Sequence, residues 1–178
     1  NFTTATDTFN TAVGYEAGHL VETGKYNTFV GGLAGDHTDD GEGNTAVGYL
    51  ALSANCGDHN TAVGSGALTV TTGAQNTAVG ENAGKSVTSG TQNTFMGVDA
   101  GEFLTTANYT TFVGLNAGKG TSGNGLTGNF NTSIGFESGL KLQTSAHQNT
   151  FLGAYAGYYN GSDSTSNGIT TGINNTAI

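Results

Sequence analysis

The residues of this chain that could bind a metal ion gather in one acidic stretch. Asp36, Asp39, Asp40 and Glu42 follow one another closely, and carboxylate oxygens are the ligands that Ca²⁺ prefers. The stretch matches neither the glycine-rich calcium repeat nor the helix-flanked calcium loop. A solvated loop is therefore the favoured interpretation, and a weak Ca²⁺ site is the alternative.

The histidines and the cysteine do not predict a metal centre. His19, His37, His59 and His147 share no common position in the sequence pattern, and no His or Cys pair has metal-ligand spacing. We expect structural or solvent-exposed roles for them. Cys56 is the single cysteine, so it cannot form an intrachain disulfide. We expect it to be a small filler at a turn, and an interchain disulfide is the minor alternative.

No motif predicts catalysis or a bound cofactor. No serine stands in the Gly-x-Ser-x-Gly frame of a nucleophile elbow, and no Gly-Lys-(Ser/Thr) box has the spacing of a phosphate-binding loop. A glycoside hydrolase needs two carboxylates around one sugar, whereas Glu81, Asp99 and Glu137 are separated by whole repeats. The chain is therefore expected not to be an enzyme. A polysaccharide-binding or depolymerising solenoid is a minor alternative.

Aromatic residues on predicted turns form a further candidate site. Such side chains can stack on sugars, grip a protein partner or cover a sheet. The residues concerned are Tyr15, Tyr49, Phe136, Tyr155, Tyr158 and Tyr159.

The composition limits the kinds of partner. The formal net charge of −9 disfavours nucleic acid and anionic membranes, and no apolar run is long enough to span a membrane. The chain has 31 glycines and no proline. The abundance of Gly and Thr argues against long helices.

A repeated phrase, Asn-Thr-(Ala/Phe)-(Val)-Gly-x-x-Ala-Gly, positions all of these residues. The clearest copies of the phrase begin at Asn10, Asn27, Asn44, Asn60, Asn76 and Asn93. The glycines from Gly14 to Gly114 recur every 16 or 17 residues. That length suits short strands and turns, and is too short for a helical pair. The sequence predicts an all-β fold, a parallel β-roll or β-solenoid of about nine to ten coils, as one domain over residues 1–178 with an incomplete coil at each end.

Two apolar columns alternate along the predicted strand, so both of its faces are expected to be buried. We assign one column to the lumen and the other to a subunit interface, because a thin coil has no second core of its own. The predicted structural core is Val13, Val30, Val47, Val63, Val79, Met96, Val113, Ile134 and Leu152. The predicted subunit interface is Ala12, Phe29, Phe95, Phe112 and Phe151.

The rest of each repeat predicts a second strand and a closing turn. The column from Ala17 to Ala156 is assigned to the second strand. Glycines such as Gly24, Gly41 and Gly90 are assigned to turn positions with positive φ. The Asn that opens each repeat is expected to stack as an amide ladder or to bond the turn backbone.

The repeat resembles two related groups. The phrase NTAVGYxAG resembles repeats of bacterial and phage tail fiber domain-containing proteins, and Asn-(Ser/Thr)-x-(Ala/Val)-(Ile/Val)-Gly more distantly resembles the head repeats of trimeric autotransporter adhesins. The resemblance covers nearly the whole chain. It implies a left-handed β-roll, a homotrimer and a place on an extracellular, cell-surface or virion fibre.

The expected function is a non-catalytic structural or adhesive segment of such a fibre, with repeated loops for surface attachment. The partners expected are further copies of the chain, and a surface glycan or protein receptor. A filament subunit that polymerises head to tail is the alternative. Ice binding by the threonine columns is disfavoured, because each Thr stands beside apolar positions.

Overall fold

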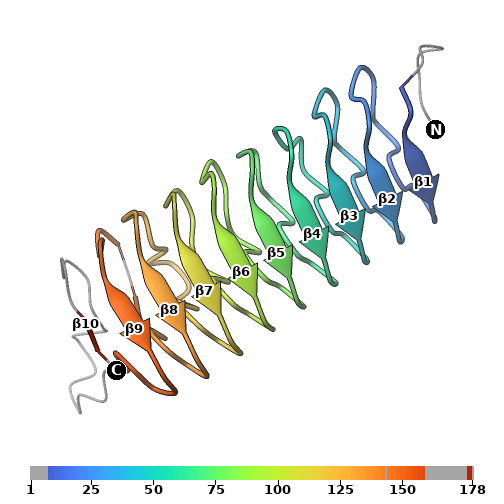
Figure 1. The fold of residues 1–178 in the computed structure, drawn as a ribbon. Coiled ribbons are helices and arrows are strands. Elements are labelled where there is room, and N and C mark those ends of the chain that lie inside the picture. The colour runs from blue at the N-terminus through green and yellow to red at the C-terminus, as the bar shows by residue number, and fades with distance from the viewer. Residues whose placement is uncertain (1–7, 143, 159–175, 178) are drawn as a thin grey trace.

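The computed structural model describes residues 8–142, 144–158 and 176–177 as a single parallel β-solenoid (Figure 1). Ten strands form one sheet in sequence order, and each strand pairs with the next in parallel. No strand exceeds three residues, and the described residues contain no helix. The strands are β1 (Thr11–Val13), β2 (Thr28–Val30), β3 (Thr45–Val47), β4 (Thr61–Val63), β5 (Thr77–Val79), β6 (Thr94–Met96), β7 (Thr111–Val113), β8 (Thr132–Ile134), β9 (Thr150–Leu152) and β10 (Thr176–Ala177).

The register of the sheet places equivalent repeat positions side by side. Thr45 pairs with Thr61, Ala46 with Ala62 and Val47 with Val63, and the same match holds along the sheet. Backbone hydrogen bonds continue around the turns, as from Leu33 N–H to the Tyr15 carbonyl (2.8 Å) and from Gly18 N–H to the Ala34 carbonyl (2.9 Å). Each coil is therefore tied to its neighbours around much of its circumference, which confirms the predicted all-β solenoid.

The assignment of the two strand columns is wrong, because the structure exchanges their roles. Phe29, Phe95, Phe112 and Phe151 are buried inside the coil of their own chain, and Ala12 packs partly buried against the same core. These five residues are therefore core residues and do not form a subunit interface.

The predicted core column lies on the outside of the sheet. Val63 and Val113 are half-buried, and the other members are exposed, from 36% at Val30 to 58% at Val13. The column comprises Val13, Val30, Val47, Val63, Val79, Met96, Val113, Ile134 and Leu152. The strand alternation was predicted, but alternation alone does not say which apolar face points inward.

The lumen accepts the inner column because side chains compensate in size within several of the coils. Coils with Phe on the strand have Gly six residues later, as in Phe95 with Gly101; a Cβ at Gly101 would lie 2.6 Å from the Phe95 ring. Coils with Ala46 or Ala62 instead carry Leu52 or Leu68 at that place, both fully buried. Ala78 is followed by Gly84, and there side chains of the adjacent coils, Leu68 and Phe95, occupy the space. The lumen is therefore close-packed through matches within some coils and between neighbouring ones.

The predicted second strand is absent from the described residues. Ala17 and Ala34 are buried and Ala156 is partly buried, but all three lie in turns. The chain leaves the strand at a glycine with strongly positive φ, +134° at Gly97. A Cβ there would lie 2.5 Å from the carbonyl oxygen of Gly114 in the next coil, so the stacking itself requires glycine.

The closing-turn glycines also differ from the prediction. Gly24, Gly41 and Gly90 do not have positive φ; the residues two places later do, including Tyr26 (φ 59°) and Gln92 (φ 58°). Glycine is needed at the predicted sites because a Cβ at Gly90 would lie 2.5 Å from the carbonyl oxygen of Ala107 in the next coil. Glycine therefore occupies these positions because neighbouring coils approach closely, and not because the turn needs a positive φ.

The asparagine ladder is confirmed, and it forms a polar seam inside the solenoid. Asn76 is buried, and its side chain donates to the Gly90 carbonyl (2.8 Å) and accepts from the backbone N–H of Asn93 (3.1 Å). The same contacts recur at Asn27, where Oδ1 accepts from Asn44 N–H at 2.7 Å. The ladder satisfies turn groups that would otherwise be buried without partners.

Candidate functional site

The most extensive candidate site is the outward surface of the sheet, which we call the outer face. It consists of two columns of residues in register. One is the Thr that begins each strand, from Thr11 in β1 to Thr176 in β10, and the other is the aliphatic residue that ends each strand, from Val13 in β1 to Leu152 in β9. These columns contain no charged residue. With strands about 4.8 Å apart, nine steps give a face about 40 Å long.

The aliphatic column of the outer face is an unusual feature for the surface of one chain. Large apolar side chains normally occur singly on surfaces, and a contiguous patch of several hundred Å² marks an interaction site. Val79 is 37% exposed, Met96 46% and Leu152 47%, and they occupy the same position of their coils. The outer face can therefore bury apolar area against a matching partner.

Exposed aromatic residues stand at both ends of the strands. Phe9 and Tyr26 stack with their rings 5.6 Å apart and nearly parallel, and Tyr109 and Phe130 stack at 5.0 Å. All four immediately precede the first residue of a repeat phrase. They were missed as candidates, although this shared position one residue before the phrase could have identified them.

A second aromatic group lies just after the C-terminal ends of the strands in the last coils. Phe136 contacts Tyr155 edge to face at 5.2 Å, and Tyr155 contacts Tyr158 at 5.6 Å. The structure thus brings together three of the six predicted aromatics. Tyr15 and Tyr49 are exposed in the first coils, after β1 and β3. Tyr159 lies outside the described residues.

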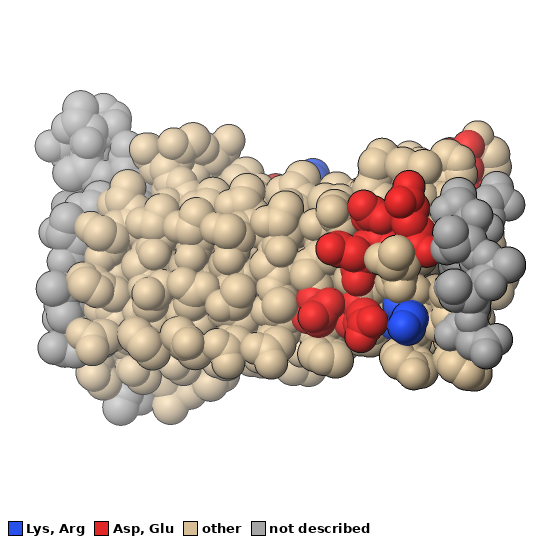
Figure 2. Space-filling model, turned by 90° about the horizontal axis from the view of Figure 1, so that it is seen from above, with Lys and Arg blue, Asp and Glu red and all other residues tan. Residues whose placement is uncertain are grey.

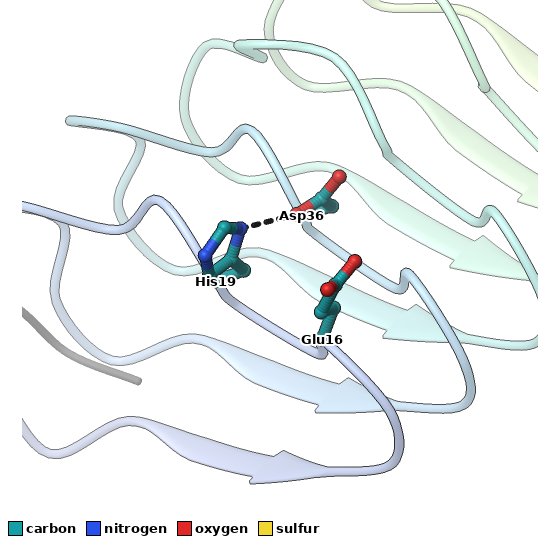
Figure 3. A group of neighbouring side chains, drawn as sticks. All are labelled: Glu16, His19 and Asp36. Atoms are coloured by element: carbon teal, nitrogen blue, oxygen red, sulfur yellow. Dashed lines mark ion pairs between the residues drawn. The ribbon is translucent and has the colours of Figure 1, made fainter.

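The predicted Ca²⁺ site is not assembled. Asp36, Asp39, Asp40 and Glu42 do not converge, since within the described ranges the one group of three or more potential metal-ligand residues is Glu16, His19 and Asp36 (Figure 3). Asp40 and Glu42 are exposed. The carbonyl of Asp39 accepts backbone N–H groups from Glu22, Thr23 and Gly24, so Asp39 serves the turn.

Acidic side chains gather over the N-terminal coils on the face shown in Figure 2, and the remainder of that face is largely uncharged. Exposed acidic residues of the turns in this part of the chain are Glu22, Asp40, Glu42 and Asp58. Asp58 accepts a hydrogen bond from the backbone of Glu42 (2.9 Å). These contacts make the acidic residues part of a solvated turn surface.

An ion-pair group joins two later coils. Lys119 Nζ lies 2.9 Å from Asp99 and 3.1 Å from Glu102. Burial lowers the pKa of Lys119, but the bonds to both carboxylates outweigh it and the net pKa is raised. Both carboxylates therefore neutralise a lysine, and they are not arranged as the acid and base of a glycosidase.

Two shallow hollows lie on the surface formed by the described residues. One, of about 260 Å³, is lined by Phe103, Gly125 and small or hydroxyl residues without any titratable side chain. The other, of about 270 Å³, is lined by Leu20, Glu22, His37, Asp39 and Asn55. Neither contains a nucleophile paired with a base.

Cys56 is a buried filler, as predicted. Burial raises the pKa of its thiol to about 11, against the opposing effect of its hydrogen bond with Thr38. The Thr38 Oγ1 to Cys56 Sγ distance is 3.5 Å. A thiol with a raised pKa is a poor nucleophile at neutral pH.

Comparisons with protein-family models, with curated proteins and with solved structures each found no match. Within residues 8–142, 144–158 and 176–177, no helix is long and apolar enough to cross a membrane.

Proposed function

We propose that the chain is a non-catalytic structural and adhesive segment of an extracellular fibre, in which three copies pack through their outer faces. The observation that carries the proposal is the unbroken aliphatic column on the outside of the sheet, from Val13 to Leu152. The resemblance of the repeat to tail-fibre and adhesin repeats supports the extracellular setting and the number of copies.

Another copy of the same chain suits the outer face better than a charged partner would. A carboxylate or ammonium group pressed against this face would lose its water and find no opposite charge. A second outer face offers the same methyl groups at the same spacing along the axis. Parallel copies can therefore pack valine against valine over the length of the sheet, while the acidic turns stay in water.

The outer face supplies about half of the area of a stable interface. A face about 40 Å long and about 10 Å wide measures about 400 Å², within the range of the largest apolar patches on monomers. Stable interfaces bury about 800 Å² per partner. The exposed aromatics at the strand ends, such as Tyr49 and Tyr109, would supply further area.

Sedimentation and light scattering test this proposal. The wild-type chain is expected at three times its chain mass, and the double variant Val63→Lys/Val79→Lys at one chain mass with its circular dichroism unchanged. Ser89→Lys, on an exposed closing turn, is the matched control and should keep the wild-type mass. A folded wild-type monomer at high concentration would contradict the proposal, and a mass that rises without limit would indicate head-to-tail polymerisation instead.

Ice is the second candidate partner of the outer face. Of the apolar residues beside each Thr, the Ala or Phe lies in the lumen, and only the aliphatic residue at the end of the strand shares the outer face. A row of threonine hydroxyls at strand spacing beside methyl groups can hold ordered water. Thermal hysteresis of the full chain, abolished by Thr77→Lys, would favour this function over trimer formation.

A further inference from the structure

We propose that Glu16, His19 and Asp36 form a Zn²⁺ site that fastens the first coil to the second. Their ligand atoms lie within 4.8 Å of one another. Glu16 and His19 come from the turn after β1, and Asp36 comes from the equivalent turn after β2 (Figure 3). His19 and Asp36 are one coil apart in sequence, so the stacking of coils brings them together.

The distances suit a tetrahedral metal ion. His19 Nδ1 lies 3.3 Å from Asp36 Oδ1. Zinc bonds to nitrogen and carboxylate oxygen are about 2.0–2.1 Å, which makes the edge of a tetrahedron about 3.3–3.4 Å. The two atoms are therefore already separated as two ligands of one zinc ion would be.

The buried carboxylate of Asp36 provides an independent indication of a ligand. The residue is only 8% exposed, and its Oδ1 is buried and accepts no hydrogen bond among the described residues, although it faces His19. The one polar contact of this oxygen among the described residues is the ion-pair contact with His19 Nδ1, and two such ligand atoms at 3.3 Å need a proton or a metal ion between them. A cation between Asp36, His19 and Glu16 would meet that need.

The neighbouring residues resemble the supporting shell of a metal site. His37 Nδ1 lies 3.0 Å from Asp36 Oδ2, the oxygen that faces away from His19. A hydrogen bond between Tyr15 and Glu16 raises the Tyr15 pKa. Partners of this kind orient ligating carboxylates.

The donor set selects the type of metal. One imidazole nitrogen with two carboxylates suits zinc and related first-row ions, whereas Ca²⁺ takes six to eight oxygen ligands. The His19 side chain is 41% exposed, so an ion can enter from solvent and retain a water molecule. At the same position as His19 and Asp36, the next two coils carry Ser53 and Thr69, so the pattern is confined to the first two coils.

Binding would stabilise the end of the described sheet. Within the described residues β1 pairs with β2 alone, so the first coil lacks the second neighbour that inner coils have. A zinc ion held by both coils binds the folded state, and stability rises with the concentration of free metal.

Isothermal titration of the tag-free full chain with ZnCl₂, after chelator treatment, tests the site. We expect one Zn²⁺ per chain, a raised melting temperature and an X-ray absorption spectrum with nitrogen and oxygen ligands. His19→Ala and Asp36→Asn should each weaken binding at least tenfold, whereas the exposed His59→Ala should not change it.

Two results would overturn the zinc assignment. One is the absence of saturable zinc binding to the folded wild-type chain, and the other is unchanged binding in His19→Ala. His19→Ala removes a half-exposed side chain, so it keeps the test valid if Asp36→Asn does not fold. Saturable binding of CaCl₂ without binding of ZnCl₂ would also contradict the assignment.

Discussion

The two faces of the sheet are built from alternate residues of the same strands, yet they hold apolar side chains under different constraints. On the inner face, Phe95 is fully buried and its size is matched by Gly101 in the same coil. On the outer face, Val79 is 37% exposed, and its neighbours in the column are Val63 and Met96. Packing on the inner face determines how the coil folds, whereas the residues of the outer face can determine how copies of the chain associate.

The largest expected effect comes from breaking the size match of the inner face. Phe95→Ala should lower the free energy of unfolding by about 3–5 kcal/mol, because it leaves a cavity in the lumen. Denaturant unfolding would measure the loss. Phe112 should behave alike, since its ring also occupies space that a side chain at Gly118 would need.

A double variant sharpens this prediction. Gly101→Leu alone should destabilise by overpacking against Phe95. Phe95→Ala combined with Gly101→Leu reproduces the pairing of Ala62 with Leu68, and a favourable coupling of about 1–3 kcal/mol is expected. Additive losses in this double-mutant cycle would show that the two sites do not compensate each other.

The next effect concerns the asparagine ladder beside the inner face. Asn76→Ala should destabilise by about 2–4 kcal/mol, because the Gly90 carbonyl and the Asn93 N–H lose their partners in a buried place. Thermal unfolding would detect it. Gln75→Ala, at the exposed neighbouring position, is the control and should change stability little.

The buried thiol of Cys56 should make the stability of the chain depend on pH. Its pKa is about 11 in the folded chain against an ordinary 9.0, so the folded state holds the thiol proton more firmly. The stability that the protonated thiol contributes is complete below pH 9 and is lost as the pH rises towards about 11. The free energy of unfolding should fall by no more than about 2–3 kcal/mol over this range.

Denaturant unfolding from pH 8 to 11 measures this loss against Cys56→Ala, which removes the thiol and shares all other titrating groups. The wild-type chain should lose more stability over this range than the variant. Equal slopes for the two proteins would contradict the proposed burial effect.

The smallest effect is expected on the outer face. Val30→Thr keeps the shape of a side chain that is 36% exposed, so the free energy of unfolding of the separate chain should change by about 0.5 kcal/mol or less. The same change should weaken association, because it puts a hydroxyl in the aliphatic column. Concentration-dependent sedimentation would separate the two effects.

The period of the sequence was sufficient to predict the solenoid and the ladder. Repeating glycines at 16 or 17 residues set the coil length, and Asn at a fixed place implied stacked amides. Which apolar column faces inward was not predictable from alternation, because both Ala/Phe and Val are apolar. The pairing of Phe with Gly in four coils and of Ala with Leu in two was a usable signal, since a confined column needs such compensation.

The candidate sites were predicted less well, for a related reason. The acidic stretch was read along the chain, whereas the solenoid places residue 19 next to residue 36. Glu16 and His19 were therefore missed as neighbours of Asp36. Reading the sequence in columns of one coil would have brought His19 and Asp36 together, although the approach of Glu16 depends on how the turn folds.

The most direct test of the account compares charges placed on the two faces at adjacent positions. Ala78 is fully buried and Val79 is 37% exposed. Circular dichroism and thermal unfolding of Ala78→Asp and Val79→Asp should show the first unfolded and the second folded. A folded Ala78→Asp beside an unfolded Val79→Asp would contradict the assignment of the faces.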